Sequence, residues 1–267
     1  MPRLTEFGIC YSLISMTNLL YNRLKFTPFY RLFLTGLFLV LTIACSSAKS
    51  DSNKVFRMPI SNEPPTLDWS LATDSVSFDI LTNLMEGLTQ YDSNMDPIPA
   101  VAKRWEITNN GKIITYYLRD DVFWTDGKPV TAHDFEYSWK RLLNPATAAQ
   151  YAYFLFDIEN AQEFNSGEIS DPSKVGVSAK TDHILEVRLK KPVVYFPSVT
   201  TFMVTFPQRR DVIEKFGDHW TDPKNIVTNG PFKLSAWEHE YKLTLTANDN
   251  FYEGRPSLDK VLAYVVR

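Results

Sequence analysis

Three segments of this chain alternate between apolar and polar residues, and this pattern constrains the fold more than any other feature. They are Ile114–Arg119, Leu185–Lys190 and Lys242–Ala247. A period of two places every second side chain on the same face, so each segment is predicted to be a strand with one buried face. Helical signals lie between the strands, and no internal repeat or flexible linker is visible. The sequence therefore predicts a mixed α/β fold, or an α+β fold with antiparallel hairpins.

Two further segments carry a helical pattern that ends near a glycine. Ser77–Leu88 places its apolar side chains on one stripe, with Gly87 near the predicted end. Gln208–Phe216 is predicted to be a helix that ends at Gly217, because glycine readily leaves the helical conformation.

A third helix has a signal at each end. Thr131 and Asp134 match an N-terminal capping box, in which each residue satisfies backbone donors of the first turn. The helix is expected to end before Asn144-Pro145, because the residue before a proline disfavours the helical conformation. The last run, Val261–Val266, is predicted to be a strand.

The amino-terminal end carries the pattern of an export signal. An uncharged apolar run extends from Leu32 to Ala44, basic residues precede it, and Cys45 and a small polar run follow. A membrane-spanning helix needs about 20 residues, so a cleaved signal over residues 1–44 is favoured over a transmembrane anchor. Leu41–Cys45 resembles the lipobox of bacterial lipoproteins, which implies that Cys45 is lipidated. The protein is then expected on the periplasmic or cell-surface side of a bacterial membrane, anchored by its lipid.

Charge and motifs exclude several classes of function. The formal net charge is −3 and no basic block occurs, so nucleic-acid binding is not expected. The four histidines lie far apart, without a second ligand at metal-binding spacing. There is no nucleophile elbow, phosphate loop or dinucleotide fingerprint. We therefore expect no enzyme activity, no metal site and no cofactor.

Aromatic residues are abundant, with 6 Trp, 13 Tyr and 18 Phe. In an exported protein without catalytic motifs they favour a binding cleft, because rings give a large contact area at a small entropy cost. Most of the rings are expected in the core, including Trp105, Phe135 and Trp139. The run Tyr151–Phe154 follows an Asn-Pro loop, and at least one of its rings is expected to be displayed.

One long stretch carries a resemblance to a known family. Residues 100–141 read AVAKRWEITNNGKIITYYLRDDVFWTDGKPVTAHDFEYSWKR. This stretch resembles the signature region of the family 5 extracellular solute-binding proteins, the peptide-binding components of ABC importers. The resemblance covers nearly all of residues 55–267 and is greatest to the oligopeptide-binding, OppA-like branch, including its murein-tripeptide relative. Further matching segments are Pro65–Asp68, Glu86–Leu88, Glu214–Gly217 and Asn225–Phe232.

The resemblance implies a periplasmic-binding-protein type II-like fold whose lobes close on a ligand. Lobe I would use residues 45–85 and 208–267 and would be incomplete, and lobe II would use residues 86–207. The third lobe of the family, which follows the strand at Val261–Val266, is missing. The chain is therefore expected to be the amino-terminal half of a receptor.

The resemblance also implies which residues contact the ligand. In the family, a segment after the Leu-Asp pair binds the peptide main chain, and it maps here to Thr73, Asp74 and Ser75. A tyrosine after the Asn-Pro loop also touches the peptide, and it maps to Tyr151. Main-chain pairing explains why such receptors tolerate many side chains. Two plainer alternatives stay open, a helix N-cap at Thr73–Ser75 and a core ring at Tyr151.

The expected function is that of a monomeric extracytoplasmic lipoprotein that delivers oligopeptides to the permease subunits of an ABC transporter. Closure around a ligand needs both walls, so a half receptor is expected to bind peptide weakly or not at all. Two alternatives stay open: a relative that binds murein peptide, dipeptide or nickel, and a surface lipoprotein with an adhesion or signalling role.

Overall fold

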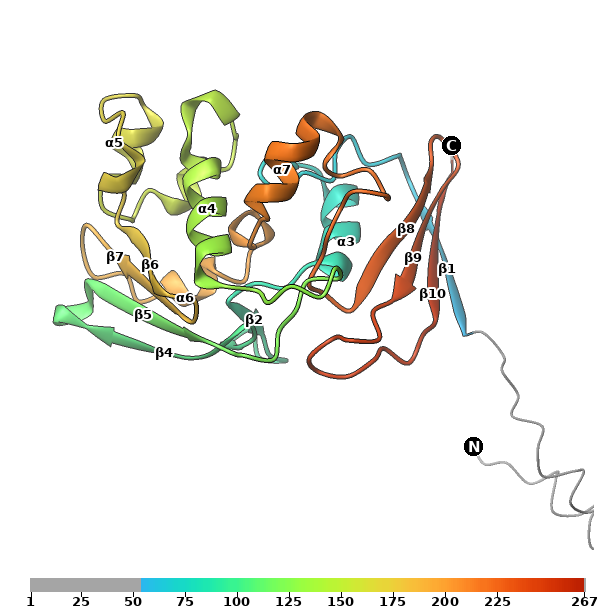
Figure 1. Ribbon diagram of the computed structural model, residues 1–267, viewed down its shortest axis with the longest axis horizontal. Helices are drawn as coiled ribbons and strands as arrows, with labels where there is room; N and C mark the ends of the chain where they lie inside the picture. Colours follow the sequence, from blue (N-terminus) through green and yellow to red (C-terminus); the bar gives the residue numbers. More distant parts are fainter. Residues whose placement is uncertain (1–53, 267) are drawn as a thin grey trace, which may run out of the picture. The chain divides into compact units, whose positions relative to one another are not determined.

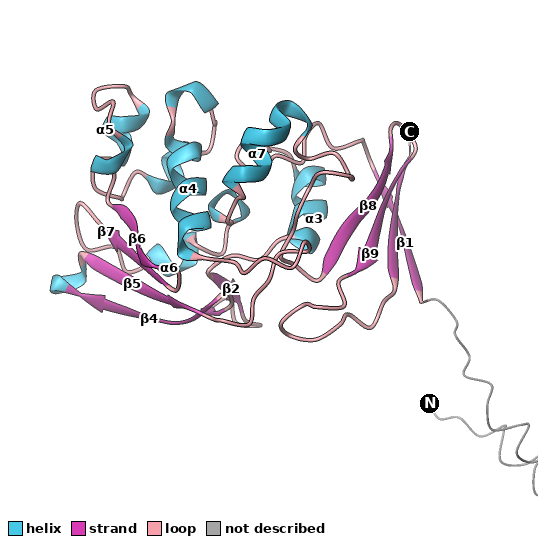
Figure 2. Cartoon of the chain, viewed as in Figure 1, coloured by secondary structure: helices cyan, strands magenta, loops and turns pink. Residues whose placement is uncertain are grey.

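The described strands form two four-stranded sheets and one short hairpin, together with helices (Figure 1 and Figure 2). The computed structural model describes residues 54–266. The predicted signal segment 1–44 and Cys45 lie outside the described residues. Strands and helices both contribute to the buried core, so the prediction of a mixed α/β fold is confirmed.

The first sheet joins the two ends of the described chain. Its order is β1-β10-β9-β8, formed by β1 (Val55–Ile60), β10 (Lys260–Val265), β9 (Lys242–Ala247) and β8 (Phe232–Glu238). β1 runs parallel to β10, whereas the other pairs are antiparallel. The apolar residues of β9 are buried and its polar residues are half-buried, as the alternation predicted. The predicted last strand is confirmed as β10.

The second sheet is antiparallel throughout. Its order is β4-β5-β7-β6, formed by β4 (Ala102–Thr108), β5 (Ile113–Leu118), β7 (Ile184–Arg188) and β6 (Val177–Thr181). Every second residue of β5 and of β7 is buried, which confirms both predicted strands.

The α-helices of the described chain are short, and α4 is the longest of them. They are α3 (Ser75–Leu84), α4 (Ala132–Leu143), α5 (Ala161–Asn165), α6 (Phe196–Val199) and α7 (Arg210–Phe216). A hairpin of β2 (Thr89–Tyr91) and β3 (Pro97–Pro99) also belongs to this region. Figure 1 shows α4 lying above the second sheet, and it packs against β6 and β7.

The ends of α4 agree with the prediction. The Asp134 carboxylate accepts hydrogen bonds from the backbone nitrogen of Thr131 at 2.8 Å and from its hydroxyl at 3.1 Å. Burial raises the pKa of Asp134 in spite of these bonds. The helix ends at Leu143, and Asn144 is extended before the proline. The predicted helix at 208–216 is also present as α7, although it begins at Arg210.

The prediction for Ser77–Leu88 was wrong about where the helix ends. α3 ends at Leu84, and Met85 is extended with φ −133° and ψ 152°. The buried apolar run continues through Met85 and Leu88, so burial alone does not separate the helix from the extended segment after it. The cause is tertiary, because the Leu84 carbonyl accepts a hydrogen bond from the backbone nitrogen of Gly230 at 2.9 Å.

The core prediction is confirmed for two of three aromatic residues. Phe135 and Trp139 are fully buried on α4, and the Trp139 indole donates to the Thr205 carbonyl at 2.7 Å. Trp105 is only half-buried, with its ring 6.4 Å from that of Tyr116. Trp105 lies on β4, the edge strand of the second sheet, where one flank has no neighbouring strand to cover it.

The predicted lobes are compatible with the sheets but stay a prediction. Strands of the first sheet come from residues 55–60 and 232–265. Strands of the second sheet come from residues 102–188, inside the segment assigned to lobe II.

Candidate functional site

Asp74, one of the predicted ligand residues, caps the start of α3. Its carboxylate accepts hydrogen bonds from the backbone nitrogen of Ser77 at 2.9 Å and from the Ser77 hydroxyl at 2.7 Å. These bonds satisfy a backbone donor that a helix start leaves free. The simpler interpretation of Thr73–Ser75 as a helix N-cap is therefore confirmed. A helix N-cap is compatible with a second role for the main chain of this segment, in ligand binding.

Tyr151 lies next to this cap, although it is far away in the sequence. Its hydroxyl donates a hydrogen bond to the Thr73 carbonyl at 3.3 Å. The Tyr151 ring is half-buried, and Ser75 is exposed. The structure thus brings together the four residues that the resemblance predicted, Thr73, Asp74, Ser75 and Tyr151. Whether they bind a ligand stays a prediction.

Tyr151 belongs to a group of five rings, which we call the aromatic cluster: Phe78, Tyr151, Tyr153, Phe154 and Phe202. The Tyr151 ring centre lies 6.2 Å from that of Phe78, 5.6 Å from that of Phe154 and 5.9 Å from that of Phe202. Tyr153 is 54% exposed, which confirms that one ring of the run 151–154 is displayed. Sequence reasoning missed Phe78 and Phe202, because nothing in the sequence indicates that they meet a run so far from them.

A buried polar cluster connects two of the segments that carry the resemblance. The Arg141 guanidinium binds the Asp68 carboxylate through two hydrogen bonds, of 2.9 Å and 2.6 Å. The Gln208 amide donates to the Ser70 hydroxyl at 3.0 Å, and the Trp220 indole donates to Asp68 at 3.4 Å. A largely buried charge pair with two hydrogen bonds holds its elements in one arrangement, so the residues of this cluster have a structural role.

Two other segments that carry the resemblance also meet. The Asn229 side chain accepts from the Glu86 backbone nitrogen at 3.0 Å and donates to the Glu86 carbonyl at 3.2 Å. Burial, and to a lesser extent the nearby carboxylate of Glu253, raises the pKa of the Glu86 carboxyl to about 7. The amide side chain thus pairs with the main chain at the place where the chain leaves α3.

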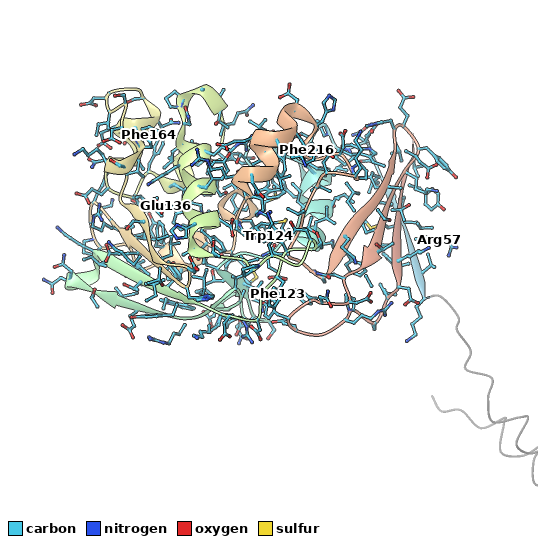
Figure 3. The ribbon with its side chains drawn as sticks, viewed as in Figure 1. Arg57, Phe123, Trp124, Glu136, Phe164 and Phe216 are labelled. Atoms are coloured by element: carbon cyan, nitrogen blue, oxygen red, sulfur yellow. The ribbon has the colours of Figure 1, made fainter. Side chains whose placement is uncertain are left out.

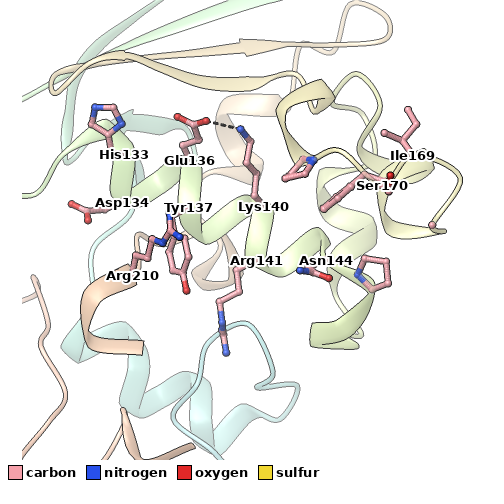
Figure 4. Close-up of a pocket in the computed structure, with 14 residues that line it drawn as sticks. His133, Asp134, Glu136, Tyr137, Lys140, Arg141, Asn144, Ile169, Ser170 and Arg210 are labelled. Atoms are coloured by element: carbon pink, nitrogen blue, oxygen red, sulfur yellow. Dashed lines mark hydrogen bonds and ion pairs between the residues drawn. The ribbon is translucent and has the colours of Figure 1, made fainter. Parts of the chain in front are cut away.

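A groove of about 900 Å³ runs along the exposed side of α4 (Figure 4). Glu136 and Phe164 lie on its α4 and α5 sides (Figure 3). Its charged side chains are paired: Lys140 with Glu136 at 2.5 Å, and Arg210 with Glu214 at 2.6 Å. None of the four predicted ligand residues lines the groove, so it is a separate cavity whose charges already have partners.

Two other features are absent from the part of the chain that the structure describes. Among residues 54–266, no group of three or more side chains of metal-binding type comes together. In the same part of the chain, no helix is both long and apolar enough to cross a membrane.

The two sheets and the helices that pack on them have the fold of the periplasmic binding proteins, since solved structures of that type superimpose on the chain with a TM-score of 0.77. The model of the bacterial extracellular solute-binding proteins, family 5, matches residues 96–267. The chain belongs to this family.

Similar proteins agree with this assignment. The chain is 37% identical over 215 residues to the dipeptide-binding protein DppE of Bacillus subtilis, which covers 80% of the chain. It is 35% identical over 214 residues to the probable deoxycholate-binding periplasmic protein YgiS of Escherichia coli, which covers 79% of the chain. The substrate-binding domain of an oligopeptide ABC transporter from Bacillus anthracis has a TM-score of 0.77, with 38% identity over 80% of the chain.

The chain is much shorter than these proteins. It spans 39% of DppE, 40% of YgiS and 42% of the Bacillus anthracis chain. DppE and YgiS are named for different ligands, dipeptide and deoxycholate, at nearly equal identity, so identity alone does not choose among ligands for this chain.

Proposed function

We propose that this chain is an extracytoplasmic receptor component that takes up oligopeptides for the permease subunits of an ABC importer. The observation that supports it most directly is the contact between Tyr151 and Thr73. This contact supports the proposal because it joins Tyr151 and Thr73, which are both predicted to touch the peptide. An extended peptide would pass over Thr73–Ser75 by main-chain hydrogen bonds, and the ring of Tyr151 would support it. The peptide-binding relatives support the same ligand class.

The direct test is calorimetry of the full chain against mixed tri- to pentapeptides. A full-length peptide-binding relative serves as the positive control, and deoxycholate and Ni²⁺ serve as competing ligands. We expect heat with peptides alone, and less of it than with the full-length relative, because the chain spans only about 40% of such receptors and closure around a ligand needs both walls. Heat with deoxycholate or nickel in the absence of peptide binding would contradict the proposal.

A pair of matched variants tests the site. Tyr151→Phe removes the hydroxyl that binds the Thr73 carbonyl and keeps the ring. Tyr195→Phe removes the hydroxyl that binds Asp157 at 2.7 Å on an exposed surface. We expect the first variant to weaken peptide binding about 2- to 10-fold, the value of one hydrogen bond, and the second to leave it unchanged. Equal effects of the two variants would place the peptide elsewhere.

We also propose that lipid on Cys45 anchors the mature protein, a role supported by the lipobox-like segment before it. In bacterial cells, Cys45→Ser is expected to move the protein from the membrane fraction to the soluble fraction. Unchanged membrane association of this variant would argue against lipidation.

A further inference from the structure

Tyr153 is the displayed member of the aromatic cluster. Its ring stacks on that of Phe154, with centres 4.7 Å apart and an angle of 25° between the planes. The side chain nevertheless stays 54% exposed. Phe154 stacks on one face of the ring, so the exposed area belongs to the rest of the side chain. Such a surface can accept a second ring by stacking or by edge contact.

Other members of the aromatic cluster and two buried residues support this ring. Phe154 packs on Phe202 at 4.8 Å, and Tyr151 stands nearly perpendicular to Tyr153, at 6.0 Å and 89°. Tyr153 and Phe154 belong to a short helical turn, Ala152–Leu155. The first and last residues of this turn, Ala152 and Leu155, are buried and hold it to the core. A ring that is already held in place loses little entropy when a ligand binds, so its contacts contribute fully to affinity.

The rings around Tyr153 have no cation stacked on them. In the part of the chain that the structure describes, no Arg or Lys lies over any ring of the aromatic cluster. The Asp74 carboxylate beside Thr73 already accepts two hydrogen bonds from Ser77. An apolar ring therefore gains contact area against the aromatic cluster, whereas a charged side chain would give up water to lie against apolar rings.

We propose that Tyr153 determines specificity and gives the protein a preference for peptides with an aromatic side chain close to the point where the main chain passes Tyr151. This inference rests on the proposed function. Side chains on one face of an extended peptide repeat about every 6.6 Å, close to the 6.0 Å between the two tyrosine rings. The preferred side chain therefore lies within two residues of the contact with Tyr151.

A peptide scan on the full chain tests the inference. Phenylalanine is moved through the five positions of pentaalanine, and lysine is moved likewise in a second set. The dissociation constants are measured for the wild type, Tyr153→Ser, Tyr153→Phe and the control Tyr241→Ser. Tyr241 is a fair control because it is 53% exposed and also contacts a second ring, that of Tyr264 at 5.8 Å. Thermal unfolding of each variant checks that it is folded.

We expect phenylalanine at one position to bind about 5- to 10-fold more tightly than alanine. Tyr153→Ser should reduce this ratio to about twofold or less, whereas Tyr153→Phe and Tyr241→Ser should retain it. If the wild type binds none of the peptides, the proposed function fails and the inference fails with it. If peptides bind but the ratio does not depend on Tyr153, or lysine gains as much as phenylalanine, the inference alone is overturned.

Discussion

At the residue scale, Glu86 combines a main-chain role with an unusual side chain. Its backbone pairs with the Asn229 amide, and its half-buried carboxyl lies near the carboxylate of Glu253. Within residues 54–266 no hydrogen bond reaches the Glu86 carboxylate, whereas Glu253 accepts one from Gln90 at 3.2 Å. Burial therefore acts without compensation and favours the neutral carboxylic acid.

The pKa of Glu86 predicts a pH-dependent stability. Its ordinary value is 4.5 and burial raises it to about 7, so the folded state holds the proton more tightly than the unfolded state. The stabilisation is complete below about pH 4.5 and is lost as the pH rises through about 7. Glu86→Gln, which stays neutral, is expected to raise the free energy of unfolding at pH 8 by about 1–3 kcal/mol and to have little effect at pH 5.

Urea unfolding of the wild type and of Glu86→Gln at pH 5, 6, 7 and 8 measures this difference. Glu253→Gln is a useful second variant, because it removes only the smaller cause of the shift. The same difference between wild type and Glu86→Gln at every pH would show that the carboxyl does not titrate in this range.

At the scale of the elements, the end of α3 depends on a close approach by a distant segment. The backbone nitrogen of Gly230 donates to the Leu84 carbonyl, one of the groups that a helix end leaves unpaired. A Cβ atom at position 230 would lie 2.6 Å from backbone atoms of Leu84 and Met85. No larger residue fits there without moving one of the two segments.

Gly230→Ala is therefore expected to destabilise the protein by about 1–3 kcal/mol, because the overlap is with backbone atoms. We also expect Gly230→Ala to speed hydrogen exchange at the amides of Met85 and Glu86, because the contact with Gly230 holds these residues in place. Gly254→Ala is the control, since a Cβ there meets nothing within 4 Å and its φ of 98° causes strain of another kind. Unchanged exchange at Met85 and Glu86 in Gly230→Ala would mean that the contact is not tight.

Local sequence patterns could predict some features of the strands, of α3 and of the candidate site, but not others. Alternation predicted β5, β7 and β9, because the buried face of a half-buried strand consists of apolar residues at every second position of the strand itself. The end of α3 was misplaced, because Gly230 lies far from it in the sequence. In the candidate site, Thr73 and Tyr151 came from the resemblance to a family. Phe202 joins them only through tertiary packing, which no local pattern records.

At the scale of the whole molecule, the first sheet is closed by its least local pair of strands. β1 pairs with β10 from Val55 opposite Lys260 to Ile60 opposite Val265. The backbone nitrogen of Lys54 also donates to the Asp259 carboxylate at 2.6 Å. The pairing of β1 with β10 closes a loop of about 200 residues, which costs chain entropy before the strand contacts can offset it. We therefore expect this pairing to form late in folding.

Two matched Val→Ala variants test this order. Val261 lies on β10 between Phe56 and Leu245, and Val187 lies on β7 between Ile114 and Val177. Both are buried in the interior of a four-stranded sheet, and each substitution is expected to cost about 1–2 kcal/mol. Val187 pairs with strands that are nearer in sequence, so Val187→Ala should slow folding. Val261→Ala should mainly speed unfolding, because its contacts form after the transition state. Stopped-flow folding and unfolding rates in urea measure both effects, and a Val261→Ala variant that folds as slowly as Val187→Ala would show that β1 and β10 pair early.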